Sequence, residues 1–415
     1  MTVRTVPEQA ARARAAARSV AGASTQQKDE ALAAAADQLE ADIDAVLSAN
    51  ALDVAAAETA GMEPGLVDRL RLDERRVEAM AGGLRQVVDL ADPVGVVVDT
   101  WERPNGLVIS RVRVPLGVVA IIYESRPNVT SDAAGLCLKS GNVAFLRGSS
   151  TAIHSNTAIA TSLRQAVASV GVSADAVVLV EDTSRDAAVE FMQQRDFVDC
   201  LIPRGGPSLI ESIRTHATVP YVIDGAGNCH VYVDSAADLD VAERILFNAK
   251  TQRPSVCNAA ESLVVHSAVA AELLQRIDVA LADVELLGDA RARSLVPRMG
   301  VATEEDFATE YLDLKLSVRV VDTLEEAIDH IAATSTGHSE AIVTTDEAAA
   351  ERFLAEVDAA AVLWNASTRF VDGEEFGFGA EIGISTQKLH ARGPMGLEQL
   401  TTLKFVVRGD GQIRT

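Results

Sequence analysis

Residues 114–129 read Val-Pro-Leu-Gly-Val-Val-Ala-Ile-Ile-Tyr-Glu-Ser-Arg-Pro-Asn-Val and give the clearest indication of the fold. The run 118–123 is apolar at every position, which is typical of a parallel strand that is buried on both faces. A polar turn with Arg126, Pro127 and Asn128 follows directly. The segment therefore predicts a buried strand that ends in a set of polar side chains.

Alternating strand-like and helix-like segments continue toward the C-terminus. The sequence predicts strands at 118–123, 143–147, 177–180 and 198–202, and helices at 132–139, 150–168, 185–194 and 207–216. This rhythm is typical of a mainly parallel, doubly wound α/β sheet. A second α/β series begins after residue 224 and runs to about residue 395.

Two regions depart from this pattern. Residues 7–92 are rich in alanine at helical spacing and predict a set of helices. Residues 96–113 form two β-like arms around Pro104-Asn105-Gly106, a typical hairpin signal, and residues 402–408 predict a last strand. Because the arms are only half apolar, the hairpin is either simply exposed or reaches another subunit.

Composition limits the class of protein. The chain has 415 residues, of which 48% are hydrophobic, and a formal net charge of −23. This length predicts two or more domains, and the acidity argues against nucleic acid or an anionic membrane as the main partner. The four cysteines form no C-x-x-C pair, so neither a disulfide framework nor a metal site is expected. With no signal-peptide pattern and no apolar run of about 20 residues, we expect a soluble cytoplasmic protein.

Cys257 is the leading candidate for a catalytic nucleophile. It lies in Gln252-Arg-Pro-Ser-Val-Cys-Asn-Ala-Ala-Glu261, between the helix-like segment 241–250 and the strand-like segment 262–266. A thiol at such a junction can be presented to a substrate, and it needs a neighbouring base or cation to form the reactive thiolate. The alternative is a buried cysteine that acts as a small apolar residue.

Two further motifs are less specific. The strand–turn–helix segment 201–210 contains Gly205 and Gly206, whose N–H groups could approach a phosphate, although a simple tight turn is the alternative. The amide of Asn128 could donate a hydrogen bond to a developing oxyanion, or it could merely cap the following helix.

In this order the segments resemble the aldehyde dehydrogenase superfamily. Pro115-Leu-Gly-Val-Val resembles its opening strand, Arg126-Pro-Asn-Val its Asn-bearing turn, and residues 139–149 its G-N-x-V-V-L-K-P-S segment under the cofactor's adenosine. A closer resemblance, over nearly the whole chain, is to the γ-glutamyl phosphate reductase branch, also called glutamate-5-semialdehyde dehydrogenases. The segments that carry it are 123–130, 253–258, 337–342 and 376–396.

The resemblance implies an α/β fold with two doubly wound domains and a small β oligomerisation element. The NADPH-binding domain would comprise residues 1–96 and 115–223, the catalytic domain residues 224–395, and the oligomerisation element residues 97–114 and 396–415. Pairing of the hairpin with the last strand would make a homo-oligomer, either a dimer or a tetramer.

The branch reduces L-glutamyl 5-phosphate to L-glutamate 5-semialdehyde with NADPH and releases phosphate, as the second step of proline biosynthesis from glutamate. By this resemblance, Cys257 attacks the acyl phosphate, and Asn128 and the N–H group of Cys257 hold the oxyanion. Hydride then reduces the resulting thioester. A glutamate 5-kinase, which would supply the acyl phosphate, is a candidate partner.

Two departures from the wider superfamily support this narrower resemblance. The general-base Glu of the superfamily's E-L-G-G-K segment is absent from residues 222–228, although Asp224 could replace it in part. The Lys of L-K-P-S is Arg147 here, and no Glu follows Ser149 and Ser150. An acid on the ribose would repel a 2′-phosphate, so its absence favours NADPH.

The remaining expectations concern individual contacts. Glu310 falls where the superfamily places a Glu on the nicotinamide ribose, although an exposed helix-end Glu is the alternative. A zwitterionic acyl phosphate needs cationic and amide donors, and His338 is the leading choice, although a lone His is more often structural. The substrate-binding candidates are Arg126, Arg253, His338, Ser339, Asn365 and Arg369, and the cofactor-binding candidates are Arg147, Ser149, Ser150, Gly205, Gly206 and Glu310.

Two rival functions stay open. One is a different acylating or oxidising aldehyde dehydrogenase with another substrate. The other is a non-enzymatic acidic binding or scaffold protein on the same fold. The presence of Cys257, Asn128 and the Gly-rich segments argues against the second rival.

Overall fold

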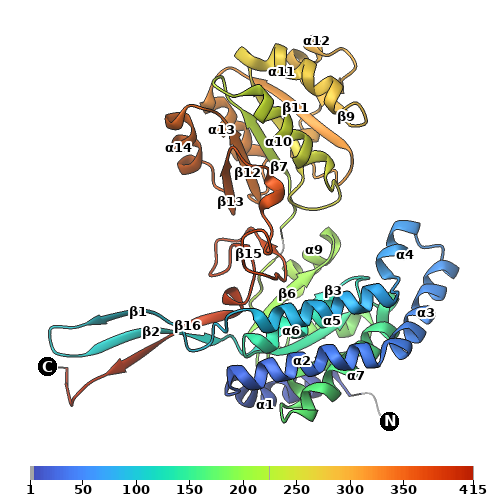
Figure 1. Ribbon diagram of the computed structural model, residues 1–415, viewed down its shortest axis with the longest axis vertical. Coiled ribbons are helices and arrows are strands. Elements are labelled where there is room, and N and C mark those ends of the chain that lie inside the picture. The colour runs from blue at the N-terminus through green and yellow to red at the C-terminus, as the bar shows by residue number, and fades with distance from the viewer. Residues whose placement is uncertain (1–3, 224, 415) are drawn as a thin grey trace. The chain divides into compact units, whose positions relative to one another are not determined.

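The computed structural model describes residues 4–223 and 225–414, and the chain divides into two compact units (Figure 1). Unit 1 comprises residues 1–223, 378–383 and 395–415, and unit 2 comprises residues 224–377 and 384–394. The Gly-rich segment 376–396 is therefore shared between the two units. The expected catalytic domain, residues 224–395, included 378–383, which the structure assigns to unit 1.

Unit 1 contains a parallel four-stranded sheet with the order β5-β4-β3-β6. Its strands are β3 (Val118–Tyr123), β4 (Val143–Gly148), β5 (Val177–Leu179) and β6 (Cys200–Arg204), followed by α6 (Val129–Lys139), α7 (Ile153–Ser169), α8 (Arg185–Met192) and α9 (Pro207–His216). Every residue of β3 and β4 is buried, which confirms the expected doubly wound sheet. Strand order reverses at β3, so the carboxyl ends of β3 and β6 form a switch point, where open sheets commonly bind ligands.

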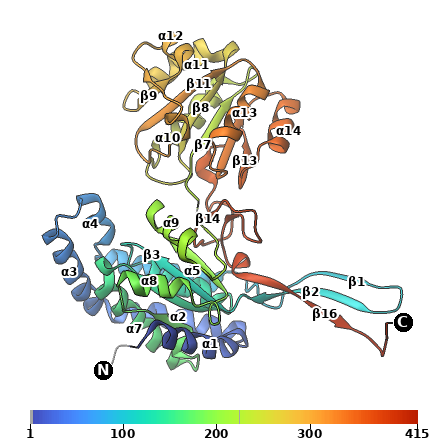
Figure 2. The ribbon, with the colours of Figure 1, turned by 180° about the vertical axis from the view of Figure 1, so that it is seen from behind.

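Within the described residues, five α-helices precede this sheet. They are α1 (Val6–Ala21), α2 (Thr25–Ala41), α3 (Ile43–Thr59), α4 (Pro64–Leu70) and α5 (Glu74–Asp89). Thr5 and Ser24 form capping boxes with Glu8 and Gln27, which satisfy N–H groups that a helix start leaves unpaired. Helix α1 packs on β3 and β4, whereas α2 packs on α5, α6 and α7. Figure 2 labels α1, α2, α5 and α7 in this part of unit 1.

A three-stranded antiparallel sheet extends from the body of unit 1 (Figure 1). The expected hairpin is formed by β1 (Val97–Glu102) and β2 (Val108–Pro115), and β16 (Thr401–Arg408) pairs with β2 along its whole length. Gly106 has a φ of 84°, a left-handed conformation that favours glycine in the turn. Phe405, on β16, is 61% exposed, so this sheet presents an apolar surface that nothing within the chain covers in the described residues.

Unit 2 contains a parallel sheet with the order β10-β9-β11-β8-β7-β12-β13. Its strands are β7 (Cys229–Val233), β8 (Ala260–His266), β9 (Glu285–Gly288), β10 (Gly300–Val301), β11 (Lys315–Val321), β12 (Ser339–Val343) and β13 (Ala361–Trp364), and its helices are α10 (Leu239–Thr251), α11 (Ser267–Ala280), α12 (Ala290–Leu295), α13 (Leu324–Thr334) and α14 (Glu347–Glu356). Val231 and Leu263 pack in the core that α10 and α11 cover, whereas Tyr232 and Val264 pack in the core that α13 and α14 cover. Both faces of the sheet are therefore buried, as the second α/β series predicts.

Three segments that precede central strands of unit 2 meet at one edge of its sheet. Cys229 pairs with Ala260 in β8, and His230 pairs with Glu340 in β12. Because these strands are parallel, their amino ends lie side by side. The segments 225–228, 252–259 and 335–338 are thereby brought together.

The functional roles expected for the separate domains stay predictions. The three-stranded sheet, expected as an element of its own, clusters with unit 1. Within residues 4–223 and 225–414, no helix is long and apolar enough to span a membrane. The same residues contain no group of three His, Cys, Asp or Glu side chains that could hold a metal ion.

Candidate active site

Cys257 lies in the loop between α10 and β8, at the amino edge of the unit 2 sheet. Of the four cysteines, all within the described residues, Cys137, Cys200 and Cys229 are buried, whereas Cys257 is partly exposed. Burial raises the pKa of each of the three buried thiols, which keeps them protonated and unreactive. The alternative of a sealed cysteine therefore does not apply to Cys257.

The backbone around Cys257 is tightly held. A Cβ atom at Gly227 would lie 1.5 Å from the carbonyl oxygen of Cys257, so only glycine fits there. The Sγ atom of Cys229 donates a hydrogen bond to the same oxygen at 3.2 Å. On the other side, Nδ2 of Asn258 donates to the carbonyl oxygen of Val371 at 2.9 Å. The loop that presents the thiol is thus fixed on both sides of Cys257.

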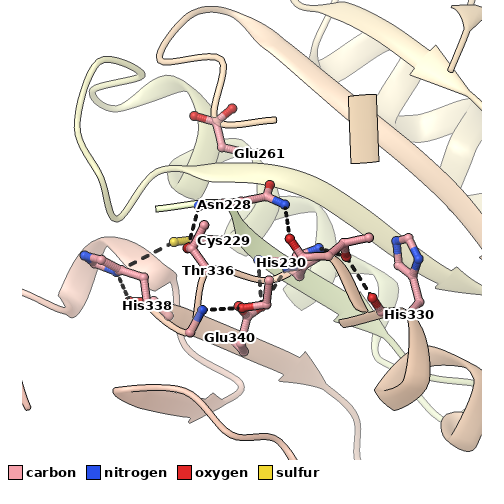
Figure 3. Close-up of polar contacts among 12 residues, drawn as sticks. Asn228, Cys229, His230, Glu261, His330, Thr336, His338 and Glu340 are labelled. Carbon is pink, nitrogen blue, oxygen red and sulfur yellow. Dashed lines mark hydrogen bonds and ion pairs between the residues drawn. The ribbon is translucent and has the colours of Figure 1, made fainter. Parts of the chain in front are cut away.

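A buried polar layer lies on β7 and β12 near this loop (Figure 3). Nδ1 of His230 and Oε2 of Glu340 are 2.9 Å apart, and both side chains are fully buried. Nδ1 of His338 lies 2.8 Å from Oγ of Ser339 and 3.8 Å from Sγ of Cys229. These contacts lie at the start of the two strands, and within the described residues the buried Nε2 atom of His338 has no hydrogen-bond partner.

His338 and Ser339 occupy different positions from those expected of substrate ligands. Both side chains are fully buried. Burial lowers the pKa of His338 to about 4, so its imidazole is neutral near pH 7 and lacks the positive charge that would attract a phosphate. The structural alternative is therefore favoured for His338, and Ser339 serves as its hydrogen-bond partner.

Lys250 and Glu261 form an ion pair across the two ends of the Cys257 loop. Nζ of Lys250 lies 2.6 Å from Oε2 of Glu261, and both side chains are fully buried. Burial raises the pKa of Glu261, and Lys250 opposes this rise. Because one partner ends α10 and the other begins β8, the pair closes the base of the loop.

Two of the arginines expected to bind substrate share the environment of the thiol. Burial and then the charge of Arg253 lower the pKa of Arg369, whereas Asp372 and Cys257 act to raise it. Nε of Arg369 donates to Oε1 of Gln252 at 2.8 Å. Arg253 is exposed. The two guanidinium groups give this part of the loop a positive potential, which favours both an anionic ligand and a thiolate.

Asn365 lies beside the carboxyl end of β12 in unit 2, whereas Arg126 belongs to unit 1. Asn365 has a φ of 52°, and its amide makes two hydrogen bonds with the backbone of Thr344, at 3.0 Å and 2.9 Å. That amide is therefore engaged in holding the end of β12, which does not support the expected contact with substrate. Arg126 is exposed on unit 1, in the turn between β3 and α6.

Asn128, the expected oxyanion donor, is exposed at the start of α6. Asn128 occupies the N-cap position of α6, but its side chain makes no capping hydrogen bond. Nδ2 donates instead to Oδ2 of Asp132 at 2.9 Å. Burial raises the pKa of Asp132 to about 6, and the hydrogen bonds from Asn128 and Ser131 oppose this rise. At neutral pH an ionised carboxylate therefore orients the Asn128 amide.

The expected cofactor ligands of the L-K-P-S-like segment lie at the carboxyl end of β4. Nη2 of Arg147 donates to the carbonyl oxygens of Thr183 and Ser184, each at 2.9 Å. Its Nε atom is buried and has no acceptor in the described part of the chain. Ser149 is half-buried and Ser150 is exposed. The segment thus offers a spare guanidinium donor and two hydroxyl groups.

In the turn between β6 and α9, the N–H group of Gly206, which was expected to approach a phosphate, is already bound to a carboxylate. The N–H group of Gly206 donates to Oε2 of Glu124 at 3.0 Å, and a Cβ atom at Gly205 would lie 2.7 Å from Cδ of Glu124. The Glu124 carboxylate therefore fills the position where a phosphate was expected. A phosphate at this helix start would have to displace it, so the tight-turn alternative is favoured.

Glu310 is half-buried rather than an exposed helix-end residue. Its Oε1 atom accepts a hydrogen bond from the N–H group of Gly227 at 2.7 Å. Glu310 therefore lies beside the Cys257 loop. Its expected contact with the nicotinamide ribose stays a prediction.

Cys257, Arg253, Arg369 and Glu310 belong to unit 2. Unit 1 contains Arg126 and Asn128, together with the cofactor candidates Arg147, Ser149, Ser150, Gly205 and Gly206. Sequence reasoning missed Lys250, Glu261, Asp132 and Glu124. One signal could have found the ion pair: Glu261 stands inside an apolar strand segment, and a buried carboxylate requires a partner. Asp224, the possible substitute for the missing general base, lies outside the described residues.

Comparisons with known proteins extend over both units. The model of the aldehyde dehydrogenase family matches residues 1–308 and 297–406. The chain is 57% identical over 405 residues to the γ-glutamyl phosphate reductase of Moorella thermoacetica, with 97% of each chain covered. It is 55% identical over 413 residues to that of Thermobifida fusca, with 99% of each covered. The crystal structure of the γ-glutamyl phosphate reductase of Thermotoga maritima matches with a TM-score of 0.98 at 47% identity, covering 99% of this chain and 100% of that one.

The buried, neutral His338 predicts a specific pH dependence of stability. Its folded-state pKa of about 4 lies below its ordinary value of 6.5. The unfolded chain therefore binds the proton first, and the stabilising contribution is lost as the pH falls from 6.5 toward 4. We expect His338→Gln to reduce the pH slope of the unfolding free energy in this window by about 1.4 kcal/mol per pH unit.

Urea unfolding of the wild type and the variant over this pH range measures that difference in slope. The change from Glu261 titration is common to both proteins and cancels. The exposed residue His154 provides the control, and His154→Gln is measured over the same pH range. Equal slopes for wild type and His338→Gln would contradict the burial of a neutral imidazole.

Proposed function

Because this chain belongs to the aldehyde dehydrogenase family and, within it, to the γ-glutamyl phosphate reductases, we propose that it reduces L-glutamyl 5-phosphate to L-glutamate 5-semialdehyde with NADPH. The enzyme would be an oxidoreductase of proline biosynthesis. The observation that carries the proposal is the partly exposed thiol of Cys257 in a rigid loop, with Arg253 and Arg369 in its electrostatic environment.

Cys257 would act as the nucleophile. Its thiolate forms a C–S bond with the acyl carbon, and the C–O bond to phosphate breaks, so that inorganic phosphate leaves with the electron pair. Bound NADPH supplies a hydride for reduction of the thioester. The C–S bond then breaks, which releases the aldehyde, and the sulfur recovers its proton.

Arg253 and Arg369 would serve two purposes. Positive charge beside a thiol favours its thiolate form. The same charges attract the dianionic phosphate of the substrate through charge-assisted hydrogen bonds. Arg369 is held by Gln252, one residue from Arg253, so the two cations belong to the loop region that carries the nucleophile.

Asn128 is the proposed side-chain donor to the oxyanion. Its Nδ2 group carries two hydrogens, of which the contact with Asp132 uses one. A fixed amide with a remaining N–H group is the arrangement that stabilises developing negative charge at little cost of reorganisation. Asp132 would then position this donor.

The stretch 222–228 contains no glutamate that could activate water. A thioester on Cys257 would therefore persist long enough to be reduced, or to be attacked by phosphate in the reverse direction. This feature favours the acyl phosphate over the rival in which an aldehyde is oxidised to a free acid.

The nicotinamide cofactor implied by the family is proposed to be NADPH. The spare Nε donor of Arg147 and the hydroxyl groups of Ser149 and Ser150 fit the 2′-phosphate. No Asp or Glu occurs at residues 151–174, so nothing in the segment directly after these serines would repel that phosphate.

We also propose a homo-oligomer formed through the three-stranded sheet. Leu403, Phe405 and Val407 alternate along β16 on one face of the sheet and are 40%, 61% and 54% exposed, and a monomer would leave this apolar surface in water. A glutamate 5-kinase, as the source of the labile acyl phosphate, is the proposed functional partner.

Replacing Cys257 tests the mechanism. We expect Cys257→Ala to lower phosphate-dependent reduction of NADP⁺ by glutamate 5-semialdehyde by at least about a thousandfold, because covalent catalysis depends on the nucleophile. Coupled absorbance assays at 340 nm, the ordinary NADPH band, measure the rate. The control is Cys200→Ala in a buried strand, which should keep the activity of any protein that still folds.

Full phosphate-dependent activity in Cys257→Ala would contradict the mechanism. Acid formation that does not require phosphate in the wild type would instead support the rival dehydrogenase. A wild-type protein with neither reaction would support the scaffold rival.

Placing a carboxylate at Ser150 tests the choice of cofactor. Ser150 is exposed, so Ser150→Glu should fold, and its charge should repel the 2′-phosphate. We expect the ratio of kcat/KM for NADPH over NADH to fall by about tenfold or more. Ser150→Gln, which has the same size without the charge, is the matched control, and equal ratios for both variants would argue against a 2′-phosphate at this position.

Small-angle scattering tests the assembly. We expect a dimer or tetramer for the wild type, and a smaller species for Phe405→Glu, because a charge on the apolar face opposes its burial. A monodisperse monomer of the wild type at every concentration would contradict the proposed interface.

A further inference from the structure

We infer that Glu310 positions the backbone of Cys257 through Gly227, and that this is a role distinct from any contact with cofactor. The inference deepens the proposed function, since it rests on Cys257 as the nucleophile. Glu310 would act at a distance from the reacting atoms, as a positioning residue.

The first link joins Glu310 to Gly227. Oε1 of Glu310 accepts the N–H group of Gly227 at 2.7 Å, which is short for an N–H···O bond and typical of a charged acceptor. The next residue, Asn228, is anchored to the same neighbouring segment, since its Nδ2 donates to the carbonyl oxygen of Phe307 at 2.8 Å. Residues 307–310 therefore hold residues 227 and 228 at two points.

The second link joins Gly227 to Cys257. A Cβ atom at Gly227 would lie 1.5 Å from the carbonyl oxygen of Cys257, 2.4 Å from its carbonyl carbon and 2.8 Å from its Cα. The two backbones are in direct contact, so a shift of Gly227 displaces the Cys257 peptide. Cys229, two residues further on, donates its Sγ hydrogen to that same carbonyl oxygen. The direction of the carbonyl group of Cys257 is thus set by residues 227–229.

The third link joins the segment of Glu310 to Glu261 through Leu312. Leu312 has a φ of 56°, a left-handed conformation that is rare for a leucine and that surrounding contacts must enforce. Its N–H group donates to Oε1 of Glu261 at 3.2 Å, while Oε2 of Glu261 accepts from Lys250 at 2.6 Å. The segment that carries Glu310 is therefore connected, through Glu261 and Lys250, to the two ends of the Cys257 loop.

Gly227 contacts the Cα, the carbonyl carbon and the carbonyl oxygen of Cys257, so the Cα–C bond is held and rotation about it is restricted, which restrains the direction of the Cα–Cβ bond that leaves the same Cα. A nucleophile held in one orientation loses less entropy on reaching the attacking geometry, and a small displacement costs rate. Without the Glu310 contact, the Gly227 side of this contact with Cys257 would be held less firmly, and the thiol could shift relative to its neighbours. Loss of the Glu310 contact should therefore lower the reactivity of the thiol itself, before any cofactor binds.

Alkylation of Cys257 by iodoacetamide, without substrate or cofactor, measures this reactivity. We expect Glu310→Ala to slow the alkylation by about tenfold, as the loss of one charge-assisted hydrogen bond implies. Glu310→Gln should recover most of the rate because its amide oxygen can still accept the Gly227 N–H group. Mass spectrometry of the labelled peptide assigns the reaction to Cys257, and Glu305→Ala, an exposed glutamate of the same segment, should react as the wild type does.

A double-variant cycle sharpens the test. Gly227→Ala forces the same displacement from the other side, so Glu310→Ala combined with Gly227→Ala should lose no more rate than the worse single variant. Circular dichroism melting separates a local shift from a failure to fold. If Gly227→Ala does not fold, the comparison of Glu310→Ala with Glu310→Gln still decides.

Unchanged or faster alkylation in Glu310→Ala would overturn the inference. If this variant instead weakened NADPH binding in a fluorescence titration and left alkylation unchanged, Glu310 would be a cofactor ligand alone. The inference fails separately from the proposed function, because alkylation needs no turnover and Cys257→Ala tests the nucleophile by itself.

Discussion

The buried ion pair between Lys250 and Glu261 is the interaction on which the candidate active site of unit 2 depends. Breaking one partner of such a pair costs about 3–5 kcal/mol, since the other charge is left uncompensated in the interior. Here the pair joins the end of α10 to the start of β8, and Glu261 also accepts the N–H group of strained Leu312. The carboxylate of Glu261 therefore joins the two ends of the Cys257 loop and also stabilises the left-handed backbone at Leu312. The partly exposed thiol of Cys257 depends indirectly on the same carboxylate.

The two units place their polar groups at opposite ends of their strands. In unit 1, Asn128 follows the carboxyl end of β3 and Arg147 lies at the carboxyl end of β4, as is usual in open α/β sheets. In unit 2, Gly227, Cys257 and His338 precede the strands β7, β8 and β12. Backbone that leads into a strand is anchored on one side by the sheet, which is why a reactive loop at the amino edge can be rigid and exposed at once.

The sequence predicted the elements well because their signals are local. The strand 118–123 and the helix 207–216 match the structure at both ends, since each is defined by its own apolar run or its own proline start. The environment of Cys257 was predicted only in part. Gly227 and Glu310 are 83 residues apart in the chain, and no local pattern indicates which N–H group a distant carboxylate will accept. The burial of His338 could not be predicted for the same reason, because it depends on the packing of β7 beside β12.

The charges near Cys257 also explain how an acidic chain can serve an acidic substrate. A net charge of −23 repels anions at long range. At physiological ionic strength, however, exposed charges are largely screened beyond about 8 Å. Close to the thiol the local pair Arg253 and Arg369 therefore outweighs the distant carboxylates. Burial and then the charge of Arg253 lower the pKa of Arg369, whereas Asp372, Cys257 and Glu375 oppose this shift, so anions near this guanidinium compensate part of its desolvation. A thiolate or a substrate phosphate is an anion of the required kind, and both belong to the proposed reaction.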